Sequence, residues 1–143
     1  KKFQVAIHTS LSRSKDTLKE VLKSYSECKE VIEDDRIVER NYGDLNGKTH
    51  LQIVEKFGIE KYDSWHRSWN IRPPKGESFE DVEKRVKSFI LSLKQLMKKT
   101  NVSVAISAHG NSIRLFRKIM ENLSIKETCG LYIPYDKVYE YEI

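Results

Sequence analysis

Strand-like and helix-like segments alternate along the whole chain, and this alternation constrains its fold more than any other feature. Apolar residues at every second position predict strands at Phe3, Val5 and Ile7, at Val102, Val104 and Ile106, and near Val138, Tyr139, Tyr141 and Ile143, with a short extended piece around Val31 and Ile32. Alternation of this kind predicts an α/β domain whose sheet is mostly parallel.

Capping residues and apolar spacing predict the helices between these strands. Expected helices begin near Ser12, at Thr49 with Gln52 as a capping box, near Ile59, at Ser78, and directly after His109. Gly58 should end the second helix, and Pro73-Pro74 the third. Their inward faces carry residues such as Leu18, Val21, Leu51, Val54, Trp65, Trp69, Val86, Phe89 and Leu115. The segment 34–48 is polar and contains glycines, so a loop is expected there.

The composition indicates one ordinary globular domain, spanning residues 1–143. A net charge of +5 suits an anionic partner, but no arginine-rich tract favours nucleic acid over a small anionic metabolite. No apolar run approaches a membrane span. Cys28 and Cys129 have neither metal-ligand nor disulfide-framework spacing, which predicts a reducing, cytoplasmic location and no metal.

The segment from Ile106 to Arg114 is the clearest candidate site. It places His109 at the carboxyl end of a strand and the amino end of a helix. Open α/β sheets bind ligands at that edge, and the free N–H groups and dipole of a helix start favour phosphate. The alternative is a hydrogen-bonded core histidine.

Other segments carry residues suited to phosphate chemistry, each with a structural alternative. Arg13 lies in the first turn of a helix, where an anion beside it would explain a cation that is otherwise a solvated charge. Glu39, in a glycine-punctuated polar loop, could act as a general acid or base, or belong to a surface ion-pair cluster. His66 and Arg67 could reach a phosphate or form a solvated face. The run 73–78 is expected to be structural.

Together these segments resemble the cofactor-dependent phosphoglycerate mutases of the histidine phosphatase superfamily. The matching runs are Thr9-Ser10-Leu11-Ser12-Arg13, the loop from Val38 to Gly47, Trp65-His66-Arg67-Ser68 with Pro73-Pro74, and Ala108-His109-Gly110-Asn111. They occur in the family's order over nearly the whole chain. The resemblance implies a three-layer fold of this mutase type.

The resemblance also implies roles for individual residues. Arg13 would clamp the transferring phosphoryl group, His109 would stabilise it in flight, and Glu39 would exchange a proton with the leaving alcohol. The implied substrate-binding residues are Arg40, Asn41, Tyr42, His50, His66, Arg67, Gly110 and Asn111. A small phosphorylated substrate, 2,3-bisphosphoglycerate as the primer of a mutase, and a homodimer are implied as well.

The family's nucleophile is another histidine, in an Arg-His-Gly motif that does not occur in these 143 residues. We therefore expect the domain to be incomplete at its amino end and to lack the family's first strand. Loss of a central strand should leave two facing, unpaired sheet edges.

Departures from the family pattern leave the reaction open. His50 replaces a family lysine, and His66 replaces the first of two adjacent arginines. Because histidine is mostly neutral at pH 7, the affinity for a carboxylate or phosphate should be lower. A site more open to water would favour hydrolysis over transfer. The sequence predicts phosphoglycerate mutase-like phosphoryl transfer through a phosphohistidine. The alternatives are a phosphomonoester phosphatase and, without the nucleophile, a non-catalytic module that binds phosphorylated metabolites.

Overall fold

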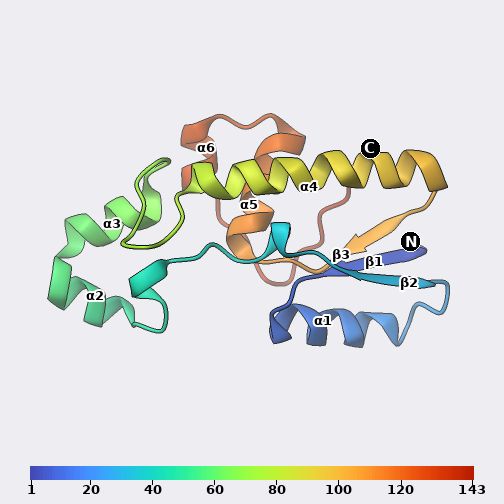
Figure 1. Cartoon of the computed structure of the whole chain (residues 1–143), viewed down its shortest axis with the longest axis horizontal. Coiled ribbons are helices and arrows are strands. Elements are labelled where there is room, and N and C mark those ends of the chain that lie inside the picture. Colours follow the sequence, from blue (N-terminus) through green and yellow to red (C-terminus); the bar gives the residue numbers. More distant parts are fainter.

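A parallel sheet of three strands forms the centre of the computed structural model, which describes residues 1–143 (Figure 1). The strands are β1 (Val5–His8), β2 (Glu30–Glu33) and β3 (Val104–Ile106), in the order β2-β1-β3. In register, Ala6 lies between Val31 and Ala105. The predicted α/β class and mostly parallel sheet are confirmed.

Helices cover both faces of the sheet, which gives the predicted three layers (Figure 1). Helix α1 (Ser12–Leu22) lies on one face; α4 (Phe79–Thr100), α5 (Gly110–Glu121) and the short α6 (Ile125–Gly130) lie on the other. No helix is both long enough and apolar enough to span a membrane.

The alternation of side chains along β1 builds two separate apolar clusters. Val5 and Ile7 point to the larger one, where α4 contributes residues such as Val86 and Phe89, and α5 contributes Leu115. Ala6 points the other way and packs with Phe3 and Leu18. The period of two in the strand thus decides which helices cover which face.

Helices α2 (His50–Phe57) and α3 (Ile59–Arg67) project from one end of the molecule, and we call residues 49–67 the α2–α3 arm (Figure 1). The Thr49–Gln52 capping box begins α2 as predicted, and Gly58, with a φ of 86°, ends it. The arm has its own small core of Leu45, Ile53 and Trp65.

The predicted last strand is wrong. Residues 131–143 form no helix or strand. Instead, the Tyr139 ring lies 4.5 Å from the Arg117 guanidinium, and the Tyr141 hydroxyl donates to Glu121 over 2.5 Å. Side-chain contacts with α5 thus account for the alternating apolar residues of this segment.

The expected pair of facing, unpaired edges is also wrong. Strand β1 pairs directly with both β2 and β3, so the three strands are continuous and the open edges are the outer sides of β2 and β3. Helix α6, capped by Ser124, was not predicted.

Several local predictions need correction. Helix α3 ends at Arg67, well before Pro73-Pro74. The expected loop 34–48 contains two 3-10 helices, Asp35–Ile37 and Gly43–Leu45. In α2, Ile53 is the buried residue and Val54 is half-buried, whereas Leu51, predicted to face inward, is 66% exposed.

Candidate functional site

Two strand-to-helix junctions lie side by side at the carboxyl edge of the sheet, because β1 and β3 are parallel neighbours. Ser14 ties them together: its hydroxyl donates to the Ser107 carbonyl over 2.6 Å and accepts from the Thr9 N–H over 3.0 Å. The Ser107 hydroxyl donates back to the Ser14 carbonyl over 3.0 Å. The residues after β1 and those after β3 therefore form one rigid corner.

His109 occupies this corner and is 5% exposed. Its Nδ1 accepts from Arg13 Nε–H over 3.2 Å, and its Nε2 lies 2.7 Å from Thr9 Oγ1. Burial lowers the pKa of His109; the Glu39 carboxylate opposes this shift, and the Arg13 charge adds to it. The ring is therefore neutral at pH 7 and is held on both of its nitrogens.

Glu39 faces the start of α5 from the loop that follows β2. Its Oε1 accepts two backbone N–H groups, from Arg40 over 2.8 Å and from Asn111 over 3.1 Å. A Cβ placed on Gly110 would lie 3.8 Å from Oε2. The two N–H bonds hold Oε1, whereas Oε2 makes no hydrogen bond within the protein.

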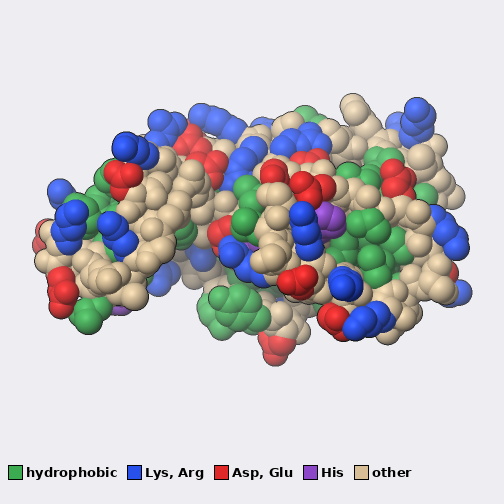
Figure 2. Space-filling view, turned by 60° about the horizontal axis from the view of Figure 1, so that its bottom comes forward, with side chains coloured by type: hydrophobic (Ala, Val, Ile, Leu, Met, Phe, Trp, Pro, Cys, Tyr) green, Lys and Arg blue, Asp and Glu red, His purple; other side chains and the backbone are tan.

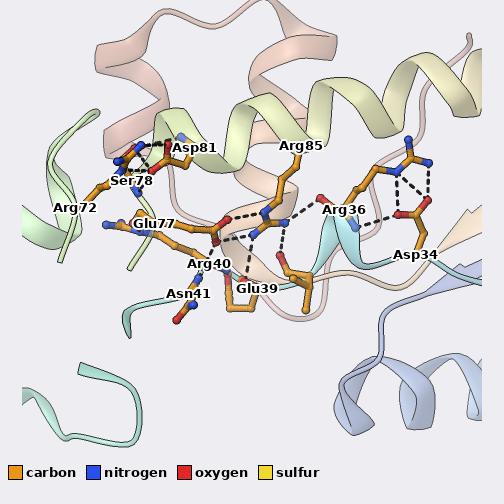
Figure 3. Close-up of polar contacts among 11 residues, drawn as sticks. Asp34, Arg36, Glu39, Arg40, Asn41, Arg72, Glu77, Ser78, Asp81 and Arg85 are labelled. Atoms are coloured by element: carbon orange, nitrogen blue, oxygen red, sulfur yellow. Dashed lines mark hydrogen bonds and ion pairs between the residues drawn. The ribbon is translucent and has the colours of Figure 1, made fainter. Parts of the chain in front are cut away.

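Arg85 holds the backbone of the loop that carries Glu39 (Figure 3). From helix α4, it donates to the carbonyls of Arg36 and Val38, each over 2.9 Å, and of Glu39 over 3.3 Å. The same guanidinium forms two hydrogen bonds with the Glu77 carboxylate, at 2.9 and 3.0 Å. One partly buried cation thus fixes three carbonyls of this loop and one carboxylate.

Glu77 holds the backbone of the next part of this loop, at Asn41. Its carboxylate accepts the Asn41 N–H over 2.9 Å, and its own N–H donates to the Asn41 carbonyl over 2.7 Å (Figure 3). The two loops touch backbone to backbone, since a Cβ on Gly43 would lie 2.1 Å from the Pro74 carbonyl oxygen. The run 73–78, expected to be structural, is the support of the candidate site.

Arg40 is buried rather than open to solvent, with an exposure of 2%. It donates to the carbonyls of Glu77 over 2.7 Å and Trp65 over 2.5 Å, and its guanidinium stacks 4.7 Å from the Phe79 ring. Its Nη1 has no hydrogen-bond partner. Burial lowers the pKa of Arg40. This placement links the site loop to the α2–α3 arm.

Tyr42, His50 and His66 lie together at the arm, beside a cavity of about 300 Å³. The Tyr42 hydroxyl accepts from Asn111 Nδ2 over 3.1 Å, which joins this group to the start of α5. Arg67 is exposed on α3. The Asn41 side chain is used within its own loop, where it accepts from Gly43 N–H and from Asn46 Nδ2, each over 2.8 Å.

The predicted site residues thus form two adjoining groups. Arg13, Glu39, His109, Gly110 and Asn111 gather around the two helix starts, while Tyr42, His50 and His66 line the cavity. On the face in Figure 2, basic side chains are interspersed with acidic ones, and the arm forms a lobe at one end. Sequence reasoning missed Arg85, because a helix face rich in charges is ordinary and carries no signal in a single sequence. Tyr62 also lines the cavity.

The side chains include no group of three or more His, Cys, Asp or Glu residues placed to hold a metal ion. The donors that meet at the corner of the two junctions are the Arg13 guanidinium and the His109 imidazole. Such donors bind phosphate oxygens.

A family model described as the histidine phosphatase superfamily (branch 1) matches residues 1–143. This match over the whole chain shows that the chain belongs to the histidine phosphatase superfamily. The fold and the two strand-to-helix junctions after β1 and β3 agree with it. The predicted family is confirmed.

Curated relatives carry mutase names. The chain is 35% identical over 127 residues to a 2,3-bisphosphoglycerate-dependent phosphoglycerate mutase of Bartonella henselae, covering 88% of this chain and 62% of that protein. It is 35% identical over 144 residues to the enzyme of the same name from Parvibaculum lavamentivorans, covering 99% and 68%. The chain therefore spans about two thirds of the length of these relatives.

Solved structures of similar fold carry phosphatase names. A mycobacterial glucosyl-3-phosphoglycerate phosphatase in complex with inorganic phosphate superposes with a TM-score of 0.75 at 24% identity, over 91% of this chain and 63% of that one. An alpha-ribazole phosphatase from Shigella flexneri gives 0.73 at 22%, over 88% and 60%. These likenesses confirm the fold.

Proposed function

We propose that this chain supplies the proton donor and the phosphoryl-binding side chains of a site that cleaves small phosphomonoesters. One observation carries the proposal: Glu39 has Oε1 fixed by two N–H groups at the same corner where Arg13 contacts His109. A carboxyl group with one free oxygen beside a guanidinium and an imidazole combines a general acid with anion-binding groups.

Each side chain has a defined task in this proposal. The Arg13 terminal nitrogens, which make no hydrogen bond within the protein, bind phosphoryl oxygens. His109 turns its Nε2–H from Thr9 to a phosphoryl oxygen. Because these groups are already positioned, little reorganisation accompanies the reaction.

The proton balance follows from the resemblance, which gives the family's nucleophile as a histidine of an Arg-His-Gly motif. Attack by that imidazole forms a P–N bond and breaks the P–O bond, while Glu39 gives its proton to the departing alkoxide oxygen. Glu39, now a carboxylate, takes a proton from the attacking water as the P–N bond breaks and phosphate leaves. Glu39 ends protonated, as it began.

Phosphatase activity is the outcome that the cavity favours. The positions where the resemblance expects Lys and Arg hold His50 and His66, and burial lowers the pKa of His66, so its ring is neutral at pH 7. A pocket with Lys48 as its one lysine or arginine fits the carboxylate and second phosphate of 2,3-bisphosphoglycerate poorly.

Phosphoglycerate mutase is the second candidate. The loop from Val38 to Gly47 and the names of the curated relatives support it. In that reaction, the phosphoryl group would return to the other hydroxyl of the bound glycerate instead of to water.

Product analysis separates these candidates. The complete natural protein is incubated with 3-phosphoglycerate, with and without 2,3-bisphosphoglycerate, and also with p-nitrophenyl phosphate. We expect free phosphate as the main product; 2-phosphoglycerate formed without phosphate would establish the mutase. Binding of phosphate without turnover of any ester would contradict both and leave a non-catalytic module. Glu39→Gln should lower turnover by about 10²–10⁴-fold.

The proposal also includes a cytoplasmic homodimer, as the cysteine usage and the family resemblance predict. Light scattering of the purified protein measures its mass in solution. A monomer at micromolar concentration would contradict the dimer.

A further inference from the structure

The exposed face of helix α4 carries positive charges that no carboxylate balances. Residues 84–120 contain no Asp or Glu. Lysines on other helices form ion pairs, as Lys118 does with Glu83 over 2.7 Å. The exposed lysines of α4 form none, and they are Lys84, Lys87, Lys94, Lys98 and Lys99. Like charges three or four positions apart on a helix repel, so an anion outside the chain would stabilise this face.

Four of these lysines lie on one straight line along the helix. Positions 84, 87, 91, 94 and 98 follow one another in steps of three and four, and such steps return to the same side of an α-helix. The middle position holds Leu91, which is 60% exposed. We call the residues at these positions the α4 stripe. At a rise of about 1.5 Å per residue, the stripe is roughly 21 Å long. A row of this shape can contact a flat surface along its whole length.

The protein core lies behind the stripe. The opposite side of α4 carries Val86, Phe89, Ile90 and Leu93, which belong to the larger apolar cluster. In Figure 1, the carboxyl half of α4 extends beyond α5 and α6. Every residue of the stripe is exposed, so the helix presents all of its ammonium groups to the solvent.

A cavity of about 520 Å³ opens beside the carboxyl end of the stripe. Its lining combines lysines of the stripe with apolar side chains, and its residues are Lys94, Met97, Lys98, Asn101, Val102 and Ile143. The volume falls within the range of small-molecule sites, about 300–1,000 Å³. A molecule with an anionic head and an apolar chain matches a lining of this kind, because each part meets its own chemistry.

The chemistry of the stripe favours anionic phospholipid over other polyanions. Nucleic-acid surfaces use arginine forks and aromatic rings, and the stripe contains neither. Interfaces between proteins are depleted in lysine, and a second copy of this stripe would bring like charges together. Clusters of about four to eight basic residues on a helix, by contrast, bind anionic lipid head groups. Lysine suits this task, since its stem lies along apolar surface while the ammonium group stays in water.

We propose that the α4 stripe and the adjoining cavity bind the surface of a membrane that contains anionic phospholipid. The lysines contact head-group phosphates, Leu91 enters the boundary between head groups and acyl chains, and the apolar side of the cavity receives part of one chain. The binding is peripheral and reversible. The inference goes beyond the proposed function and uses no residue of the candidate site.

Sedimentation of the complete protein with vesicles tests the inference. One vesicle preparation contains equal parts phosphatidylcholine and phosphatidylglycerol, and the other contains phosphatidylcholine alone. We expect binding to the anionic vesicles only, and a loss of binding as salt screens the charges. Equal binding to both preparations, or none to the anionic vesicles at low ionic strength, would overturn the inference.

A charge variant places the binding on the stripe. It combines four substitutions that keep helix propensity nearly constant: Lys84→Gln, Lys87→Gln, Lys94→Gln and Lys98→Gln. Each lysine near an anionic surface strengthens binding by about fivefold, so the variant should bind the anionic vesicles at least about 100-fold more weakly. Circular dichroism checks that the helices remain.

The matched control loses the same charge from exposed lysines on other parts of the chain, through Lys19→Gln, Lys29→Gln, Lys61→Gln and Lys126→Gln. It should bind within a few-fold of wild type. Equal losses in the two variants would show that net charge alone governs binding, and would overturn the inference.

Two further measurements separate lipid from other anions. Leu91→Gln keeps every charge and should weaken vesicle binding by about fivefold, because an apolar side chain no longer enters the bilayer boundary. Unchanged binding would overturn the lipid assignment. A DNA duplex is offered in competition with the vesicles at the same ionic strength. Preference for the vesicles supports the inference, whereas release of the protein by the duplex would assign the stripe to nucleic acid and overturn it.

Discussion

Arg13 fixes the tautomer of His109. Its Nε–H donates to His109 Nδ1 over 3.2 Å, and a guanidinium nitrogen has only a proton to offer, so Nδ1 must be the unprotonated nitrogen. The ring proton of the neutral form then lies on Nε2, 2.7 Å from Thr9 Oγ1. The ring therefore presents an N–H at the position from which a phosphoryl oxygen can replace Thr9.

We predict that nitrogen-detected NMR will show His109 as the neutral Nε2–H tautomer at pH 7. Arg13→Met removes the donor to Nδ1, so the tautomers should then mix. Thr9→Val should leave Nδ1 unprotonated, because the bond from Arg13 remains. A wild-type spectrum with the proton on Nδ1 would contradict the proposed role of Arg13.

The stability of the protein should fall in acid partly because of His109. Its pKa is lowered in the folded state from an ordinary value of 6.5, so between these two values the unfolded chain binds more protons. The stabilising contribution is complete above about pH 6.5 and is lost as the pH falls through the folded-state pKa. Denaturant unfolding at several pH values measures this loss. His109→Gln should flatten the curve over that window; an unchanged slope would contradict burial as the cause.

His109→Ala should abolish most turnover. The substitution removes the N–H that we assign to the phosphoryl oxygen, and a lost donor of this type costs on the order of 3–4 kcal/mol of transition-state stabilisation. Steady-state kinetics should show the loss in kcat more than in KM, since the group acts in the transition state. Wild-type turnover in this variant would refute the role.

Arg85→Gln should lower kcat without touching any group that contacts substrate. Arg85 is a positioning residue that holds the carbonyls of Arg36, Val38 and Glu39, so its loss should let the Glu39 carboxyl group move (Figure 3). Displacement of about 1 Å can cost roughly 10²-fold in rate. A kcat loss with nearly constant KM distinguishes this role from a general loss of folding.

Arg72→Gln is the matched control for this experiment. Arg72 also forms two hydrogen bonds with a carboxylate, that of Asp81, but its side chain is 63% exposed and lies away from the Glu39 loop. Exposed ion pairs contribute about 0–1 kcal/mol to stability, so kcat should stay near wild type. Equal kcat losses in both variants would show that Arg85 has no special effect on Glu39.

Much of the fold could be predicted because its signals are local. The period of two in β1, the helix cap at Ser78 and the stop at Gly58 all depend on neighbouring residues, and all are confirmed. The segment with Tyr139 and Tyr141 was mispredicted because its alternation is that of a strand, whereas its contacts are with α5. A single sequence does not tell which partner an alternating segment will meet.

Some residues of the candidate site could be predicted from local sequence patterns, and others could not. The strand–glycine–helix pattern at His109 can be recognised from sequence, and the structure brings this residue to Arg13 across 96 positions of the chain. The roles of Glu77 and Arg85 could not be predicted, because they depend on loops 73–77 and 39–43 packing backbone to backbone. Whether the predicted residues act in catalysis stays a prediction that the variants above test.

Phe79 stabilises the domain through two cations, the buried Arg40 and the partly buried Arg114, as well as through its apolar surface. The ring is 1% exposed, with the guanidinium of Arg40 at 4.7 Å and that of Arg114 at 5.1 Å from its centroid. Burial lowers the pKa of both arginines, so the ring partly replaces the water that each has lost. Phe79→Leu keeps most of the apolar surface but removes both cation–π contacts, which contribute about 0.5–2 kcal/mol each.

We therefore expect Phe79→Leu to lower the free energy of unfolding more than Phe89→Leu does. Phe89 is equally buried, at 1% exposure, but faces one more distant cation, Arg36, at 5.7 Å. Urea unfolding of both variants should show a difference of about 1–3 kcal/mol, since Phe79→Leu removes two cation–π contacts and Phe89→Leu removes one longer contact. Equal losses would mean that the ring acts only by its size, and that Arg40 and Arg114 are held by their carbonyl partners alone.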